Sequence, residues 1–469
     1  MRVCSFIVIV AGLALLPQYA PAQKATQAAG SGHWVSTWAT AQQLQPAPAG
    51  GFGGRGPGPG RGAPGAPGAP ANPGALNPQP PAAPASSATP QAPPNAARPP
   101  QGGRANPNRT NLPATLSDQT IRMPIRVSLG GAQARIEISN MVGAQPLEVG
   151  AAHIAAYQGK GSIAAGTDRA LTFSGNASVI VPPGTLALSD PVSLSVAPMS
   201  DLAVSLYLPR DTGAPTTHNI GLHTAYISKG NVTGNESMPD PIATTACTWL
   251  SSVDVMAPKD AYTIVALGDS ITDGYSTTTD ADMAWPTLLA KRLSKNKATQ
   301  NVAVVNQGIS GNQVLRDGAG ISALARFDRD VLSRPGVKWV VLLEGINDIN
   351  IRGRTEGPGA LASDDLIAGY RQLIERCHLY GIKIAGATIM AEEGVPTASE
   401  RGEGVRQAVN QWIRGKGHFD AIVDLDAATR DPQHPARLKQ EYDSGDHIHP
   451  NDAGNQAMAD AFDLSLFKK

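Results

Sequence analysis

The stretch YTIVALGDSITDG, residues 262–274, decides the fold of the C-terminal half of the chain. Its first six residues form a continuous apolar run that ends at a glycine, which is the pattern of a strand buried on both faces. Gly268 and Asp269 predict a tight turn after this strand, and the residues after Ser270 can begin a helix. The Ser270 hydroxyl is therefore expected near a helix amino end, where the dipole favours negative charge.

Further buried strands and amphipathic helices alternate after this stretch. Strands are predicted at Val302–Val305, Trp339–Leu343, Ile382–Ile389 and Ile422–Leu425, and helices at Trp285–Leu293, Asp364–Tyr380 and Ala453–Leu466. This alternation predicts an α/β domain over residues 262–469, with a parallel sheet covered on both faces. Ligand sites in such sheets lie at the carboxyl ends of the strands.

The N-terminal half shows short β runs with Gly and Pro between them. A strand-like alternation at 33–40 comes before the insertion. The run at 120–129 leads to Gly130-Gly131, which offers a two-residue turn into a half-buried strand. Later runs lie at 171–173, 178–181, 192–196 and 202–208. Many short strands with such punctuation predict a β-sandwich accessory domain over residues 34–255.

Residues 45–113 interrupt this β domain. The stretch is dominated by Pro, Gly, Ala, Asn and Gln, lacks Asp and Glu, and has Phe52 as its only aromatic residue. Such a segment cannot bury enough apolar surface to offset the entropy of ordering, so a disordered insertion is predicted. A cell-wall spacer is the functional alternative to a tolerated insertion.

The first residues have the pattern of an export signal. Arg2 is followed by an almost wholly apolar run to Leu16, and Ala20-Pro21-Ala22 supplies small residues before a cleavage site after Ala22. The run is shorter than the roughly 20 residues that a spanning helix needs, so a membrane anchor is the less favoured interpretation. Residues 1–22 thus predict a secreted or periplasmic protein without stable membrane insertion.

Composition excludes some partner classes. Lys plus Arg and Asp plus Glu are equal at 38 each, so no basic excess indicates nucleic acid or an anionic membrane. Cys4 leaves with the signal, and Cys247 and Cys377 are interpreted as buried free thiols, although a disulfide stays open in an exported protein. Neither cysteine lies in a Cys/His cluster, so no structural zinc is expected.

A serine cannot attack an ester without a base, and the segment Asp443–Asn451 supplies candidates. Asp446 and His449 are three residues apart, so one turn can place both on one side, with His449 taking the Ser270 proton and Asp446 orienting the imidazole. His447 and Asp443 are rivals in the same segment, and the Asp-x-x-His-Pro spacing favours His449. A metal site is the other interpretation of this run, but no partner cluster is visible elsewhere.

Two loops after later strands can stabilise an oxyanion. Residues 306–312, NQGISGN, contain glycines that let a backbone N–H approach a substrate closely. Residues 344–348, EGIND, contain Asn347, whose amide can donate as a backbone N–H does. The glycine loop alone would equally suit a plain turn.

These four segments, in this order, resemble the four blocks of the SGNH (GDSL) hydrolase family. The resemblance covers residues 262–469 and implies a flavodoxin-like three-layer fold and metal-independent ester hydrolysis without a cofactor. It implies Ser270 as nucleophile and first oxyanion donor, Gly311 as second donor and Asn347 as third, with Asp446 and His449 completing the triad. Gly308 is the less favoured donor in its loop.

The whole chain looks similar to the xylan-esterase-like subgroup with an N-terminal β domain. The stretches that carry this resemblance include Trp34/Trp38, 189–192, Trp285-Pro286, 326–332 and 443–454. The resemblance implies deacylation, in particular deacetylation, of carbohydrate esters. The alternatives are a lysophospholipase or short-chain lipid esterase, and, from another class, a non-catalytic carbohydrate-binding surface protein. An ester substrate is the expected partner, and the oligomeric state stays open.

Aromatic and histidine residues of the β domain are given structural interpretations. Trp34 and Trp38 are four apart on a strand-like run and are interpreted as core rather than as a sugar platform. His218 and His223 are interpreted as ordinary polar residues rather than ligands.

Overall fold

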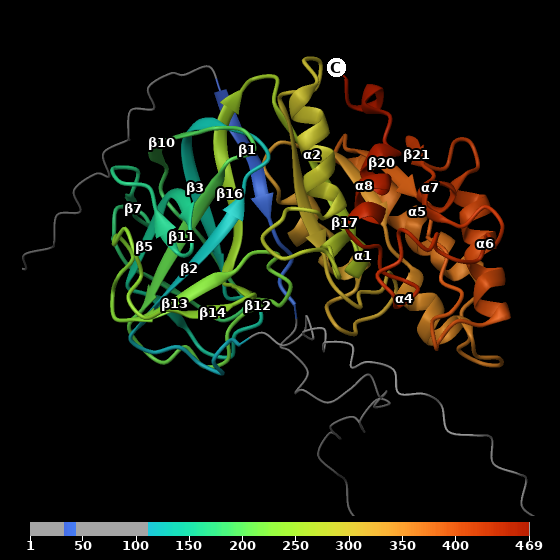
Figure 1. The fold of residues 1–469 in the computed structure, drawn as a ribbon, viewed down its shortest axis with the longest axis horizontal. Coiled ribbons are helices and arrows are strands. Elements are labelled where there is room, and N and C mark those ends of the chain that lie inside the picture. The colour runs from blue at the N-terminus through green and yellow to red at the C-terminus, as the bar shows by residue number, and fades with distance from the viewer. Residues whose placement is uncertain (1–31, 44–110, 469) are drawn as a thin grey trace, which may run out of the picture.

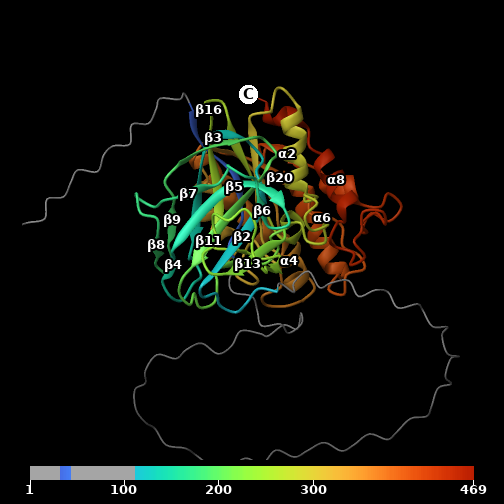
Figure 2. The same ribbon diagram turned by 60° about the vertical axis from the view of Figure 1, so that its left-hand side comes forward.

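The computed structural model describes residues 32–43 and 111–468 (Figure 1). The predicted export signal and residues 45–110 of the predicted insertion lie outside the described residues. The described chain forms an all-β part that ends at Pro258 and an α/β part that begins at Tyr262. Figures 1 and 2 show the two parts side by side.

Antiparallel sheets build the N-terminal part. One sheet has the order β1 (Gly32–Ala39), β16 (Leu250–Pro258), β3 (Gly131–Ser139) and β10 (Val192–Val196), with β9 (Leu186–Leu188) also on β3. Another has the order β14 (Ile242–Thr244), β13 (Ala225–Lys229), β2 (Gln119–Arg126), β11 (Asp201–Leu208), β5 (Ala151–Gly159) and β6 (Ser162–Ile163), with β7 (Arg169–Leu171) on β5. Two short pairs join β12 (Thr217–His218) to β15 (Cys247–Thr248) and β4 (Leu147–Val149) to β8 (Val179–Val181). Inward side chains of both larger sheets share one apolar core.

The two-residue turn predicted at Gly130-Gly131 does not pair the strands on either side of it, because β2 and β3 belong to different sheets. The chain crosses between them along residues 127–130, where the N–H and hydroxyl of Ser128 both donate to the carbonyl of Thr37. The two glycines serve close approach instead of a turn. A Cβ at Gly131 would lie 2.6 Å from the carbonyl oxygen of Met256, and one at Gly130 would lie 2.3 Å from that of Val196.

A parallel sheet organises the C-terminal part. Its order is β18 (Val302–Gly308), β17 (Tyr262–Gly268), β19 (Val337–Leu343), β20 (Lys383–Ala387) and β21 (Ala421–Val423). The first strand thus lies between the second and the third, and this strand order is common in doubly wound sheets. The parallel α/β sheet expected from the sequence over residues 262–469 is confirmed.

Helices and short turns connect these strands. They are α1 (Ser270–Asp273), α2 (Trp285–Lys295), α3 (Ala323–Phe327), η1 (Asp328–Leu332), α4 (Ile346–Asp348), η2 (Ile349–Gly353), α5 (Ser363–Leu379), α6 (Glu400–Ile413), α7 (Leu425–Thr429), α8 (Asp452–Asp460) and η3 (Leu464–Phe467). Helix α2 packs against β18 and α8, whereas α5 packs against β20 and α6. Helix α6 does not appear in the sequence prediction, since Gly402 and Gly404 weaken its helical signal.

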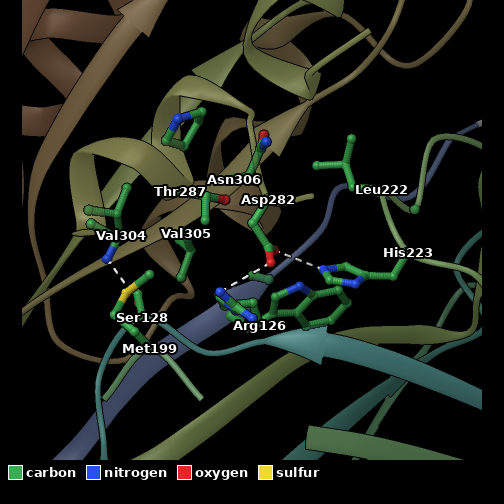
Figure 3. A pocket seen from close by; sticks show the side chains of 15 residues that line it. Arg126, Ser128, Met199, Leu222, His223, Asp282, Thr287, Val304, Val305 and Asn306 are labelled. Carbon is green, nitrogen blue, oxygen red and sulfur yellow. Dashed lines mark hydrogen bonds and ion pairs between the residues drawn. The ribbon is translucent and has the colours of Figure 1, made fainter. Parts of the chain in front are cut away.

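Strand β1 joins the two parts. The Ser36 N–H donates to the carbonyl of Pro335, and the Thr263 hydroxyl donates to the carbonyl of Ser36. Strand β18 is an edge of the parallel sheet, and its Val304 N–H donates to the Ser128 hydroxyl of the β part (Figure 3). The β part therefore covers this edge, which would otherwise present unpaired backbone groups.

Cys247 and Cys377 are both free and buried. Within residues 32–43 and 111–468, the structure contains no helix of the length and apolarity that crossing a membrane requires.

Candidate active site

The turn after β17 presents Ser270 as the first residue of α1. Asp269 caps this helix, because its side chain accepts the Ile271 N–H at 3.0 Å. A Cβ at Gly268 would lie 2.4 Å from the carbonyl oxygen of Leu343, so this close turn requires glycine. Gly274, with a φ of 98°, ends the helix after one turn.

Ser270, His449 and Asp446 form a hydrogen-bonded line. The Ser270 Oγ lies 2.8 Å from His449 Nε2, and His449 Nδ1 lies 2.7 Å from Asp446 Oδ2. Since a carboxylate only accepts, the Nδ1 proton faces Asp446 and Nε2 is left to accept the serine proton. The other Asp446 oxygen accepts the N–H groups of Ile448 and His449.

The electrostatics of Asp446 suit this arrangement. Burial alone would raise the pKa of its carboxyl, but the hydrogen bond and charge of His449 and the two backbone N–H groups outweigh burial. The pKa of Asp446 is held well below its usual range, so the carboxylate is charged whenever the histidine can act as a base.

His447 and Asp443, the rival candidates, form a separate pair. His447 Nδ1 lies 2.7 Å from Asp443 Oδ2, and the His447 side chain is 53% exposed. A Cβ at Gly394 would contact its ring, which places His447 against that loop. The structure therefore brings His449, and not His447, into hydrogen-bond distance of Ser270.

The glycine loop and Asn347 meet through one hydrogen bond. The Asn347 Nδ2 donates to the carbonyl of Asn312 at 2.9 Å, and its second amide hydrogen is left for another acceptor. Gly311 precedes Asn312 with a φ of 79°, a conformation that glycine adopts without strain. The Gly308 N–H, in contrast, donates to the side chain of Asn306, so it is committed within the loop.

Arg326 is a site residue that chemical reasoning from the sequence missed, although it begins a stretch that carries the subgroup resemblance. Its buried guanidinium donates to the carbonyl of Gly268 at 2.9 Å, to that of Gln307 at 2.7 Å and to the Asn312 side chain at 2.9 Å. It also pairs with Asp330 at 3.0 Å. One cation thus ties the ends of β17 and β18 to the glycine loop.

Buried carboxyls surround this cation. Burial, reinforced by the neighbouring acids, raises the pKa values of Asp269 and Glu344, and Arg326 opposes both shifts. Burial also raises the pKa of Asp348 to about 6, although its carboxyl accepts two backbone N–H groups of the segment after the glycine loop. The bonds to Asp348 hold the segment after the glycine loop, and the bond from Ile271 to Asp269 holds the start of α1.

Tyr275 is the second residue that sequence reasoning missed. Its ring centroid lies 4.2 Å from that of His449. Burial and the charge of Asp446 raise the pKa of its hydroxyl, so the ring is neutral beside the histidine. Its place directly after Gly274 is the sequence signal that could have identified it.

A pocket of about 50 Å³ lies at the seam between the two parts (Figure 3). Asp282 lines it, 3.2 Å from Arg126 and 3.0 Å from His223. Trp38 lines the pocket and is half-buried rather than fully in the core. Ser270 does not line it, so this pocket is separate from the reactive centre.

Among the described residues, no group of three or more His, Cys, Asp or Glu side chains is arranged to hold a metal ion.

One family model matches the C-terminal part of the chain. Residues 266–457 match the model of the GDSL-like Lipase/Acylhydrolase family. A comparison with curated proteins finds no match.

Solved structures with likeness to the chain include three hydrolases. A GDSL-like lipase from Bacteroides thetaiotaomicron is 21% identical, with 42% of this chain and 84% of that chain covered and a TM-score of 0.30. An acetyl xylan esterase from Geobacillus stearothermophilus is 22% identical, with 44% and 94% covered and a TM-score of 0.34. An alpha/beta hydrolase from the metagenome of Lake Arreo, Spain, is 24% identical, with 44% and 96% covered and a TM-score of 0.34.

Proposed function

Because residues 266–457 of this chain belong to the GDSL-like lipase/acylhydrolase family, and the chain is therefore an esterase-type hydrolase, we propose that it cleaves carboxylic esters through an acyl-enzyme on Ser270. The observation that carries the proposal is the line of hydrogen bonds from Ser270 through His449 to Asp446. Such a line gives a serine hydroxyl both a base and an oriented imidazole. Family membership sets aside a non-catalytic surface protein.

The reaction proceeds in two acyl transfers. The Ser270 Oγ attacks the ester carbonyl carbon while its proton moves to His449 Nε2. The tetrahedral intermediate collapses, the C–O bond of the leaving alcohol breaks, and the alcohol oxygen takes the proton from Nε2. Water then attacks the acyl-enzyme with the same base, and the carboxylic acid leaves as Ser270 regains its proton.

The oxyanion of each intermediate is held by the Ser270 N–H, the Gly311 N–H and the Asn347 amide. The Ser270 N–H belongs to the first turn of α1, where backbone donors have no partner within the helix. The amide of Asn347 keeps one hydrogen beyond its bond to Asn312. Removing one such donor typically costs about 3 kcal/mol of transition-state stabilisation.

The serine mechanism is tested by p-nitrophenol release from p-nitrophenyl acetate. Ser270→Ala is expected to lower kcat at least about a thousand-fold, because it removes the nucleophile. Ser294→Ala, on the half-exposed surface of α2, is the matched control and keeps the wild-type rate. Equal rates for Ser270→Ala and wild type would sink the mechanism.

The substrate class that we propose is an acetylated or short-acylated saccharide, and the subgroup resemblance of the whole chain supports it. A lysophospholipid or short-chain lipid ester is the second candidate, since the family name covers lipases. Acetate release from acetylated xylan should be compared with fatty-acid release from lysophosphatidylcholine. Activity on the second substrate alone would defeat the saccharide proposal.

We also propose that residues 262–469 form a flavodoxin-like three-layer catalytic domain.

We further propose that residues 1–22 are an export signal cleaved after Ala22. The N-terminal pattern of charge, apolar run and small residues supports export. Sequencing the amino end of the protein recovered outside the cytoplasm tests this. A mature chain that still begins at Met1 would contradict it.

A further inference from the structure

A histidine of the β part reaches the segment that carries the nucleophile. His218, in β12, is 3% exposed, and its Nε2 lies 2.8 Å from Oδ1 of Asp273. Asp273 is the last residue of α1, three positions after Ser270. This buried contact crosses between the two parts.

The second oxygen of Asp273 continues the contact into the glycine loop. Asp273 Oδ2 accepts the N–H of Ser310 at 3.0 Å and its hydroxyl at 2.7 Å. Ser310 directly precedes Gly311, the donor assigned to the oxyanion. One carboxylate thus joins His218 to the residue beside that donor.

The hydrogen-bond roles fix the charge of His218. Its Nδ1 lies 2.7 Å from the carbonyl oxygen of Ala41, which can only accept, so Nδ1 carries a proton. Its Nε2 faces Asp273, whose other oxygen already accepts two bonds as a carboxylate does. Both nitrogens therefore donate, and His218 is an imidazolium ion paired with Asp273.

The surrounding electrostatics agree with this charge. Burial alone would lower the pKa of His218, and so would the charge of Arg326. The charge and hydrogen bond of Asp273, together with the bond to Ala41, outweigh both and raise the pKa.

A second set of contacts holds the next loop from the same side. Thr224 donates its N–H and its hydroxyl to Asp280, both at 2.7 Å, and the Asp280 N–H donates to the carbonyl of Leu222. Thr278 in turn donates twice to Asp452, three residues after His449. The segment 218–224 thus contacts Asp273, at the end of α1, and Asp280, in the loop that follows α1.

We propose that His218 is a positioning residue for the reaction: through Asp273 and Ser310 it fixes the Gly311 N–H where the oxyanion forms. This inference rests on the proposed ester hydrolysis and on Gly311 as a donor. The β part, in consequence, belongs to the catalytic apparatus rather than acting only as an accessory unit. A misplacement of about 1 Å in such a donor can lower the rate about a hundred-fold.

The first test compares two histidines of the β part in the full-length protein. His218→Ala is expected to lower kcat on p-nitrophenyl acetate about 10- to 100-fold, with KM changed less than about threefold, because the loop that it fixes acts on the transition state. His153→Ala is the matched control, since His153 pairs with Asp168 at 2.8 Å within the β part. An equal loss of kcat in both variants, or a change confined to KM, overturns the inference.

The second test uses rescue at Asp273. Asparagine there can still accept from Ser310 with its oxygen, and its amide can donate to a neutral His218 Nε2, so the geometry is kept without the charge pair. Asp273→Asn is therefore expected to keep kcat within about fivefold of wild type, whereas Asp273→Ala loses at least about 30-fold. Similar rates for the two variants contradict a positioning role.

A third variant, at Ser310, tests the proposal if the variants at the buried residues His218 and Asp273 do not fold. Circular dichroism and thermal unfolding show whether each variant folds. Ser310 is half-exposed, so Ser310→Ala is expected to fold and to lower kcat about three- to tenfold with KM unchanged. Wild-type kcat in Ser310→Ala counts against the inference. Ser270→Ala is measured in parallel. An active Ser270→Ala would contradict the proposed function itself. An inactive Ser270→Ala beside full kcat in His218→Ala and Ser310→Ala would contradict only the positioning role of His218.

Discussion

The ring of Tyr275 lies 4.2 Å from the ring of His449, centroid to centroid, with a tilt of 38° between their planes. Tyr275 follows the glycine that ends α1, so one short segment supplies both the nucleophile and an aromatic wall for its base. A ring at this distance restricts the imidazole to orientations that keep Nε2 on Ser270.

Two substitutions of Tyr275 distinguish the role of its ring from that of its hydroxyl. Tyr275→Phe is expected to keep kcat within about twofold, because the hydroxyl is neutral and the stacking surface is unchanged. Tyr275→Ala is expected to lower kcat about tenfold, because the imidazole gains freedom. Steady-state kinetics on p-nitrophenyl acetate measure both, and equal rates for the two variants would show that the ring does not orient the histidine.

The two His–Asp pairs of the segment 443–449 provide an internal comparison. His449→Ala is expected to lower kcat at least about a thousand-fold, because it removes the base, and His447→Ala is expected to change kcat less than about threefold. The same contrast is expected between Asp446→Asn and Asp443→Asn, with a loss at Asp446 of at least about tenfold. Two backbone N–H groups already donate to Oδ1, so the amide nitrogen of asparagine would face Nδ1 and favour the wrong imidazole tautomer. A larger loss at His447 than at His449 would reverse the assignment of the base.

The amide of Asn347 is expected to act only in the transition state. Asn347→Ala should lower kcat about a hundred-fold, close to 3 kcal/mol, with KM within about threefold. Asn347→Asp should lose more, because a carboxylate would face the developing oxyanion. Steady-state kinetics with esters of several acyl chain lengths measure kcat and KM separately. A rise in KM with kcat unchanged would indicate that Asn347 binds the substrate in the ground state instead.

Glu392 makes the stability of the fold depend on pH. Burial raises its pKa from 4.5 to about 7, against the hydrogen bond from Asn350 and the charge of Arg406. The native state therefore holds this proton more tightly than the unfolded state, so the free energy of unfolding falls as pH rises from about 4.5 to 7 and is level above that. Glu392→Gln is expected to abolish this fall in the free energy of unfolding, which amounts to about 3 kcal/mol for a pKa shift of this size.

Thermal unfolding at two pH values tests this prediction. The Tm of Glu392→Gln should exceed that of wild type at pH 8 and match it near pH 4.5. Glu393→Gln is the control, because Glu393 forms an exposed ion pair with Arg437 that contributes little. A Tm difference for Glu392→Gln that is the same at both pH values would refute the assignment.

Local patterns were sufficient wherever a residue's role depends on its own strand or turn. The apolar run before Gly268 predicts β17, and local signals predict the turns that carry Ser270, Asp446 and His449. These turns meet because the carboxyl ends of parallel strands lie at one edge of the sheet. The alternation at Ala134, which predicts β3, is local in the same way.

Residues whose role depends on packing between distant segments were not predictable in this way. Arg326 bonds to carbonyls that only the folded sheet brings together, and His218 meets Asp273 across the seam of the two parts. The Gly130-Gly131 pair misled for the same reason, since a glycine required by a neighbouring strand has the same local appearance as a glycine required by a turn.

The pairing of β1 with β16 has a consequence for synthesis. Trp34 pairs with Met256 and Ala39 with Ser252, so the partner of the first strand is made about two hundred residues after it. At roughly 5–20 residues per second, the ribosome needs on the order of 10 to 40 seconds for that stretch. Because β1 also contacts β17 and β18, its packing is complete only after residue 308 has been made.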